Sequence, residues 1–179
     1  RRVDTGVYMG GMYSDYSFRA NHYANETKSP YRSWETFSVA NRVSHFMGFR
    51  GPSFTVDTAC SSSGTALHLA CRALRAQECE MAVAGGINLI LDPNRFAQLK
   101  RLGILSPTGR CLPFCREANG VLLGEGAGVV VLKPLAAAVK DRDHVYGIIK
   151  GTALSAGTGS IGFTAPNPRS EEHTSELQS

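Results

Sequence analysis

Hydrophobic residues recur along this chain at spacings that predict several helices. Within 38–47 they stand at i, i+4, i+7 and i+8, which is one face of an amphipathic helix. Residues 65–74 are apolar around most of the helix circumference, so we expect a buried helix there. Residues 94–102 and 135–139 also look helical, whereas the polar and aromatic stretch 14–31 suits a loop or a short helix.

Short apolar runs bounded by glycines or polar residues predict strands. These runs cover 6–11, 53–58, 81–84, 87–91, 126–132 and 145–149. Gly85-Gly86 is expected to separate two of them, and the run GAGVVVL at 126–132 is expected to be a central strand. Because strands alternate with helices, the pattern predicts a layered α/β fold. No repeat or linker interrupts the chain before Pro168.

The composition is that of one globular domain. The 179 residues are enough for a single core, and 42% hydrophobic residues with 19 glycines suit an α/β protein rather than a disordered one. No apolar run approaches the roughly 18 residues needed to span a bilayer, so we expect no membrane association. The chain starts at Arg1 without a signal-like segment or initiator Met, and we expect a piece of a longer protein.

The cysteines indicate a reduced, cytoplasmic protein rather than a disulfide scaffold, because their number is odd. The five are Cys60, Cys71, Cys79, Cys111 and Cys115. A zinc site is the alternative, but no C-x-x-C pair occurs, and Cys111 and Cys115 flank Pro-Phe without a nearby histidine. We therefore expect no metal, and we expect Cys71 and Cys79 to be small, inert core residues.

The charged residues point to no nucleic acid. The formal net charge is +4, but the basic side chains are scattered and form no run. A mild positive balance favours an acidic protein partner, although most such charge is simply a solvated surface. Residues 169–179 (RSEEHTSELQS) resemble a translated sequencing adapter, and we expect them to be an artefact tail outside the fold.

The most informative stretch is GPSFTVDTACSSSGTALHLACRAL, which places Cys60 between a predicted strand and a predicted helix. A helix N-terminus carries unpaired N–H groups and a partial positive charge, which favours a thiolate there. The same N–H groups can hold a developing oxyanion. The hydroxyls of Ser61, Ser62 and Ser63 are expected to cap the helix. The spacing alone equally permits Cys60 to be a small buried hydrophobe.

Several collinear segments, spanning most of 5–168, resemble the β-ketoacyl synthases, the condensing enzymes of polyketide and fatty-acid synthesis. The segment VDTACSSSGTALHLA is similar to their active-site segment, and GFTAPNP is similar to the ketosynthases of modular polyketide synthases in particular. The other matching segments are VANRVSHFMGFRGPS, GGINLILDP, LSPTGRCLPF and GEGAGVVVLKPL. The resemblance implies that 1–168 is the N-terminal-side portion of a ketosynthase domain with the thiolase-like layered αβαβα fold.

By this resemblance, Cys60 takes an acyl chain from the phosphopantetheine of an acyl carrier protein. The thioester is then attacked by a carbanion formed when a malonyl-type extender loses carbon dioxide. The family pattern further implies a cytoplasmic homodimer of the complete domain, with no metal or organic cofactor. Acyl carrier proteins that bear the acyl and malonyl groups are the implied partners.

The two histidines that the family uses to assist decarboxylation do not match any histidine of this sequence. They belong to HGTGT-like and NIGH-like motifs, which are absent here. His68 stands eight residues past Cys60, about 12 Å along the same helix, and suits a packing or surface role. His45 is expected to be a hydrogen-bonded core residue. We therefore expect the fragment alone to be inactive, to expose apolar surface and to aggregate.

Some positions depart from the family pattern. Phe114-Cys115 stands where many members have Phe-Asp, and Asn119-Gly120 replaces Asp-Gly. Leu123 occupies a position often held by Arg, and Gly64-Thr65 replaces a Leu-Val pair. These differences concern the subfamily and the loop packing, and they leave the nucleophile unchanged.

Three alternatives to a condensing enzyme remain open at this point. The first is a ketosynthase-like domain that only binds or passes on the acyl chain. The second is a thiolase-fold enzyme that uses coenzyme A thioesters, and the third is a structural domain with an inert Cys60.

Two glycine-rich strings are not read as nucleotide sites. The G-x-G-x-x-G string at 157–162 is closely followed by prolines, which block the helix that a dinucleotide site needs. The string GEGAG at 124–128 precedes a predicted strand rather than a helix, so it forms no phosphate cradle.

Overall fold

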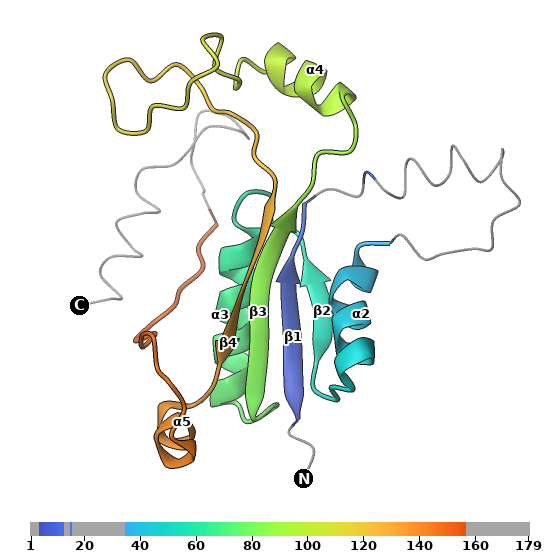
Figure 1. Cartoon of the computed structure of the whole chain (residues 1–179), viewed down its shortest axis with the longest axis vertical. Coiled ribbons are helices and arrows are strands. Elements are labelled where there is room, and N and C mark those ends of the chain that lie inside the picture. The colour runs from blue at the N-terminus through green and yellow to red at the C-terminus, as the bar shows by residue number, and fades with distance from the viewer. Residues whose placement is uncertain (1–3, 13–14, 16–34, 157–179) are drawn as a thin grey trace, which may run out of the picture.

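The computed structural model describes residues 4–12, Asp15 and 35–156. The predictions for 14–31, for the glycine-rich string 157–162 and for the tail 169–179 lie outside the described residues, apart from Asp15. The helices and strands, shown in Figure 1, are β1 (Thr5–Gly10), α2 (Phe37–Met47), β2 (Ser53–Val56), α3 (Ser62–Arg75), β3 (Met81–Asn88), α4 (Asn94–Arg101), β4 (Gly126–Leu132) and α5 (Leu135–Asp141).

A four-stranded sheet in the order β2-β1-β3-β4 forms the centre of the fold. Strands β2, β1 and β3 are parallel, whereas β4 runs antiparallel to β3. The chain passes from β1 through α2 to β2, and then returns through α3 to β3 on the other side of β1. None of the described helices is long and apolar enough to cross a bilayer.

Helices α2 and α3 cover opposite faces of this sheet. Val7 and Met9 of β1 form one buried cluster with Ala40 of α2. Tyr8, which alternates with them along the strand, packs in a second cluster with the alanines of α3. Strand β1 is consequently buried along its whole length. The layered α/β fold expected from the sequence is confirmed.

The glycine pair in β3 does not divide it into two strands as expected. Met81–Asn88 is one continuous strand. The absence of a side chain at each glycine lets a different neighbouring segment pack close to the strand. A Cβ at Gly85 would collide with the carbonyl of Gly128 and lie 2.8 Å from the side chain of Val129, both on β4. A Cβ at Gly86 would lie 2.8 Å from Cβ of Ser63 at the start of α3. The two glycines therefore allow close packing of β4 and α3 against β3, and they do not form a turn.

Two other strand predictions are wrong. Strand β4 is the edge of the described sheet rather than a central strand. Residues 145–149 form no strand, and all of them are exposed. Both runs are rich in β-branched residues, but that preference takes effect only where a neighbouring strand lies alongside.

The expected exposed apolar surface is present on β4. Val129, Val130 and Val131 are 58%, 50% and 66% exposed, although consecutive residues of a strand point to opposite faces. Both faces of β4 are thus open in the described part of the chain. Aggregation of the isolated chain remains a prediction.

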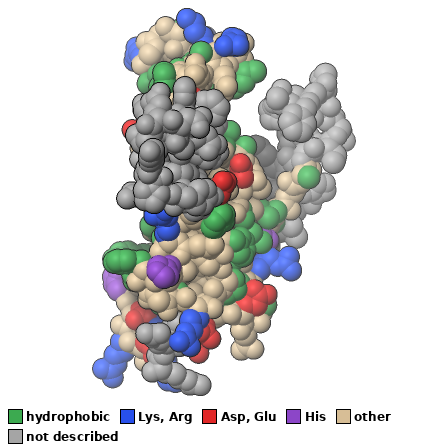
Figure 2. Space-filling view, turned by 90° about the vertical axis from the view of Figure 1, so that its right-hand side faces the viewer, with side chains coloured by type: hydrophobic (Ala, Val, Ile, Leu, Met, Phe, Trp, Pro, Cys, Tyr) green, Lys and Arg blue, Asp and Glu red, His purple; other side chains and the backbone are tan. Residues whose placement is uncertain are grey.

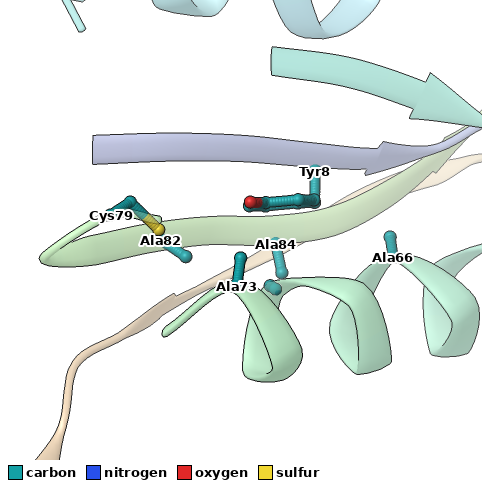
Figure 3. Close-up of a cluster of buried hydrophobic side chains, with 7 residues drawn as sticks. Tyr8, Ala66, Ala73, Cys79, Ala82 and Ala84 are labelled. Atoms are coloured by element: carbon teal, nitrogen blue, oxygen red, sulfur yellow. The ribbon is translucent and has the colours of Figure 1, made fainter. Parts of the chain in front are cut away.

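The core beneath α3 is built around one aromatic ring. Tyr8 is 1% exposed and packs among alanines of α3 and β3, with its hydroxyl pointing toward Cys79 (Figure 3). Phe54 of β2 meets the Tyr8 ring edge-on, with the ring centroids 5.0 Å apart. Cys71 and Cys79 are buried and free, as expected. Burial raises the pKa of Tyr8 and of both thiols above their ordinary values.

Because these three side chains are buried in their protonated form, we predict that the protein loses stability at alkaline pH. Each stays protonated in the folded protein, and each ionises more easily once unfolding exposes it. Their contribution to the unfolding free energy is present below about pH 9, the ordinary thiol pKa, and is lost as pH rises further. Urea unfolding at pH 8 and pH 10 should give the lower midpoint at pH 10. Cys79→Ala should reduce this difference, whereas Cys111→Ala, at an exposed thiol, should not.

Gly10 sets how closely α3 approaches the sheet. A Cβ there would lie 2.5 Å from both the carbonyl carbon of Ser62 and the nitrogen of Ser63, and neither backbone atom can rotate away. We predict that Gly10→Ala lowers the unfolding free energy by about 1–3 kcal/mol, the usual cost of overpacking. Gly64→Ala is the matched control, because nothing lies within 4 Å of a Cβ at that helical position. It should stabilise the helix by about 0.5–1 kcal/mol. Equal effects of the two substitutions in thermal unfolding would contradict this account.

Candidate active site

Cys60 lies on the corner between β2 and α3. Strand β2 ends at Val56, and α3 begins at Ser62, earlier than expected. The thiol is exposed. The interpretation of Cys60 as a small buried hydrophobe is therefore wrong for the described part of the chain.

The turn that carries Cys60 contains a strained residue. Ala59 has φ +55°, in the left-handed region that residues other than glycine rarely adopt. Such a conformation costs about 1–3 kcal/mol and persists only where the surroundings fix it. The Ala59 N–H donates to Oδ1 of Asp57 (2.9 Å), and its carbonyl accepts from the N–H (3.0 Å) and the hydroxyl (2.6 Å) of Ser62. The order of strand, strained turn and helix is the same as in the elbow of hydrolases.

The serine hydroxyls hold this turn instead of capping the helix. Ser61 occupies the N-cap position, but its side chain makes no cap hydrogen bond and donates to the carbonyl of Thr58 (2.7 Å). The hydroxyl of Ser62 accepts from the Thr58 N–H (2.9 Å). The Thr58 hydroxyl in turn lies 2.9 Å from that of Thr65, one turn into the helix. The expectation of capping hydroxyls is wrong, because these side chains fold back toward the strand end.

One backbone donor in this turn has no acceptor among the described residues. The Cys60 N–H donates to no residue of the described part of the chain. It lies at the positive end of the α3 dipole. An oxyanion formed on a group bonded to Sγ of Cys60 would therefore find an unoccupied donor next to it.

The histidines of the described residues make no hydrogen bond with this site. On α3, His68 lies with Nδ1 3.0 Å from the hydroxyl of Thr152, in agreement with the expected packing role. His45 is exposed, so the expectation of a hydrogen-bonded core residue is wrong. The buried face of α2 is formed by Ala40 and Ser44, and the next residue points outward. Among the described residues, no hydrogen bond or ion pair joins a histidine to Cys60.

The loop with the unusual Asn119-Gly120 pair is held by the asparagine side chain. Its Oδ1 accepts from the Ser106 hydroxyl (2.7 Å), and its Nδ2 donates to the Thr108 hydroxyl (3.1 Å). Gly120 has φ +142°, and a Cβ there would lie 2.5 Å from the Ser106 nitrogen. The asparagine thus performs the bracing that an aspartate could also provide at this position. Within the described ranges, no group of histidine, cysteine and carboxylate side chains could hold a metal ion.

Sequence reasoning missed a buried cation. Arg95, at the start of α4, is 4% exposed and forms an ion pair with Asp15 (2.5 Å). The only sequence signal was an arginine among the first residues of a predicted helix, where surface exposure is the usual outcome. Its partner lies 80 positions away in sequence, so no local pattern could have joined the two.

Comparisons with known proteins identify the family of this chain. Residues 1–138 match the family model described as the N-terminal domain of β-ketoacyl synthase. The chain is 45% identical over 166 residues to polyketide synthase PksL of Bacillus subtilis, covering 93% of this chain and 4% of that protein. It is 45% identical over 163 residues to polyketide synthase ThaG of Burkholderia thailandensis, covering 91% of this chain and 3% of that protein.

Solved structures give the same result. An oxazolomycin ketosynthase domain of Streptomyces albus superposes with a TM-score of 0.90 at 45% identity, over 96% of this chain and 30% of that one. The ketosynthase from module 6 of the bacillaene synthase of Bacillus subtilis gives 0.87 at 38% identity, over 98% and 30%. The chain thus spans less than a third of these ketosynthase structures and a much smaller share of the polyketide synthases.

The turn around Cys60 predicts unequal roles for neighbouring serines. Ser62→Ala removes hydrogen bonds to Thr58 and Ala59 at a side chain that is 4% exposed, so it should lower the unfolding free energy by about 1–3 kcal/mol. Ser63→Ala is the control, because that hydroxyl is exposed and bonds to no described residue. It should change the unfolding free energy by less than about 0.5 kcal/mol. Urea unfolding of both variants measures this, and a neutral Ser62→Ala would refute the role given to the hydroxyl.

Proposed function

The chain belongs to the β-ketoacyl synthase family, and we propose that its parent protein accepts an acyl chain on Cys60 and condenses it with a malonyl-type extender. The geometry around Cys60 is the main observation that supports this proposal. Cys60 is an exposed thiol on a strained, hydrogen-bonded turn at a helix N-terminus, and its own N–H is unoccupied by the described residues. Similarity to ketosynthase domains of polyketide synthases supports the reaction class.

The first step is transfer of the acyl chain. The Cys60 thiolate attacks the carbonyl carbon of the acyl thioester on the carrier, and the carbonyl oxygen becomes an oxyanion. The Cys60 N–H donates to that oxyanion, with the positive end of α3 adding to the stabilisation. The intermediate then collapses and expels the pantetheine thiolate, which leaves the acyl chain on Cys60.

The second step forms the new carbon–carbon bond. A malonyl-type thioester loses carbon dioxide, and the resulting carbanion attacks the carbonyl of the Cys60 thioester. The bond to Sγ breaks, so the β-ketoacyl product stays on the carrier and the Cys60 thiolate is regenerated. In the family, two histidines assist decarboxylation, and no histidine of this sequence matches them. In this proposal, residues of the parent protein outside the sequence supply that assistance.

The proposed partners are acyl carrier proteins, which deliver both the acyl and the malonyl groups. Exposed cations support an acidic partner at the end of the molecule where α4 lies. Lys100 and Arg101 end α4, and Arg110 and Arg116 follow in the next loop. Figure 2 shows Lys and Arg side chains at this end. A homodimer of the complete domain, without metal or organic cofactor and in the reducing cytoplasm, belongs to the same proposal.

The proposal predicts one acyl adduct on the full-length parent protein. Incubation with an acyl-loaded carrier should add a single acyl mass, located on Cys60 by peptide mapping. Cys60→Ala should abolish the adduct, and Cys111→Ala, at another exposed thiol, should keep it. Addition of a malonyl-loaded carrier should then release a β-ketoacyl carrier and carbon dioxide.

Each alternative has its own result in this experiment. A stable adduct without product after malonyl loading would show acyl transfer without condensation. Acylation by acyl coenzyme A but by no carrier would indicate a thiolase-type enzyme. An unmodified Cys60 in wild type would end the proposal, since the thiol would then be structural.

A further inference from the structure

Arg95 is the centre of a polar network at one edge of the sheet. Its guanidinium pairs with Oδ1 of Asp15, and it donates to Oδ1 of Asn88 (3.3 Å) and to the carbonyl of Leu89 (2.9 Å). The other carboxylate oxygen of Asp15 accepts from the Leu91 N–H (3.1 Å). One buried side chain thus joins Asp15, the end of β3 and the start of α4.

The network continues to the entrance of β4. Nδ2 of Asn88 donates to the carbonyl of Gly124 (2.5 Å), and Oε1 of Glu125 accepts from the Ile90 N–H (2.7 Å). The GEGAG string, which has no role as a phosphate cradle, therefore supplies polar partners for the segment that follows β3. Three chain segments that are distant in sequence are fixed to one another at this point.

This edge of the sheet also holds Cys60. Gly10, the last residue of β1, touches Ser62, and Gly86 of β3 touches Ser63. Asn88 follows Gly86 by two residues, about 7 Å along the strand. In a sheet with this strand order, ligands bind beyond the carboxyl ends of the parallel strands, where the connections diverge. The network therefore lies beside the region that an acyl chain on Cys60 must occupy.

A buried ion pair of this kind is costly and usually adds little to stability compared with apolar packing. What it does supply is fixed geometry, since a paired and hydrogen-bonded charge has one acceptable arrangement. Arginine suits this role better than lysine, because its planar fork of donors reaches several acceptors at once. The network is thus better explained by the shape that it imposes than by the stability that it adds.

We propose that Arg95 is a positioning residue for acylation: paired with Asp15, it fixes the segment that follows β3 as a wall along the acyl chain, and so sets which chains Cys60 accepts. This inference rests on the proposed function of the same site. Arg95 itself does not touch the thiol, so its loss should alter recognition of the chain rather than the reactivity of sulfur.

The test uses the full-length parent protein with short, long and branched acyl chains on the same carrier. Arg95→Met should raise KM for acylation roughly ten- to a hundred-fold for the preferred chain and alter the order of preference, since a displaced wall misplaces the chain. Arg95→Lys, which keeps the charge, should recover part of this loss. Alkylation of Cys60 by iodoacetamide should stay within about twofold of wild type, because the turn and helix dipole are unchanged.

Two further variants keep the test decisive. Asp15→Asn preserves the shape of the carboxylate but removes its charge, and it should raise KM less than Arg95→Met does. It can therefore be measured even if Arg95→Met does not fold. Arg72→Met is the control, because this arginine is exposed in the last turn of α3, away from Arg95 in the fold and outside the cations proposed to meet the carrier. It should leave the order of chain preference unchanged.

The possible outcomes separate the two proposals. Unchanged KM and chain preference in Arg95→Met and Asp15→Asn would overturn the role of Arg95 while leaving acylation of Cys60 intact. A parallel fall in acylation and in iodoacetamide reactivity would also overturn it, since the residue would then only support the fold. Absence of acylation in wild type would refute the proposed function and this inference with it.

Discussion

The candidate site depends on how closely the first turn of α3 approaches the sheet. Gly10 and Gly86 are paired in register on adjacent parallel strands, and each contacts the backbone or Cβ of the serines that follow Cys60. Two neighbouring positions without side chains allow a helix start to rest directly on the strand ends. The location of the thiol is therefore set by backbone contacts, which permit little rotation, rather than by flexible side chains.

The hydrogen-bonded turn from Thr58 to Ser62 also helps to fix the position of the thiol. The close approach leaves a short path from β2 to α3, and Ala59 follows that path only in the left-handed conformation. Thr58 and Ser62 supply the hydrogen bonds that hold it there. Strain, hydrogen bonds and the helix dipole act on the same few atoms, and together they expose the thiol beside a backbone donor.

Local patterns in the sequence were sufficient for the parts of the fold that depend on local physics. The helical period predicted α2 and α4 almost to the residue, and the strand-to-helix change placed Cys60 on the corner.

Contacts between segments that are distant in sequence could not be predicted from such local patterns. The outward direction of His45 depends on which residues of α2 meet the sheet, and the burial of Arg95 depends on Asp15. The same limit explains the errors in the strands, because the edge position of β4 and the absence of a strand at 145–149 are decided by which neighbours are present. The serine hydroxyls were expected to cap a helix, which is their commonest use, but here their nearest partners lie in the turn.

The glycine pair in β3 has a consequence for recombining ketosynthase sequences. Gly85 fits against β4, and Gly86 fits against the start of α3, so the edge strand and the turn that carries Cys60 share one rigid neighbour. A chimera whose crossover falls between Ser63 and Gly85 would combine a helix start from one parent with a strand shaped for another. Crossovers placed before Gly10 and after β4 would inherit the whole contact set from a single parent. An exchange of this whole interval therefore keeps the neighbours of Gly10, Gly85 and Gly86 matched to them.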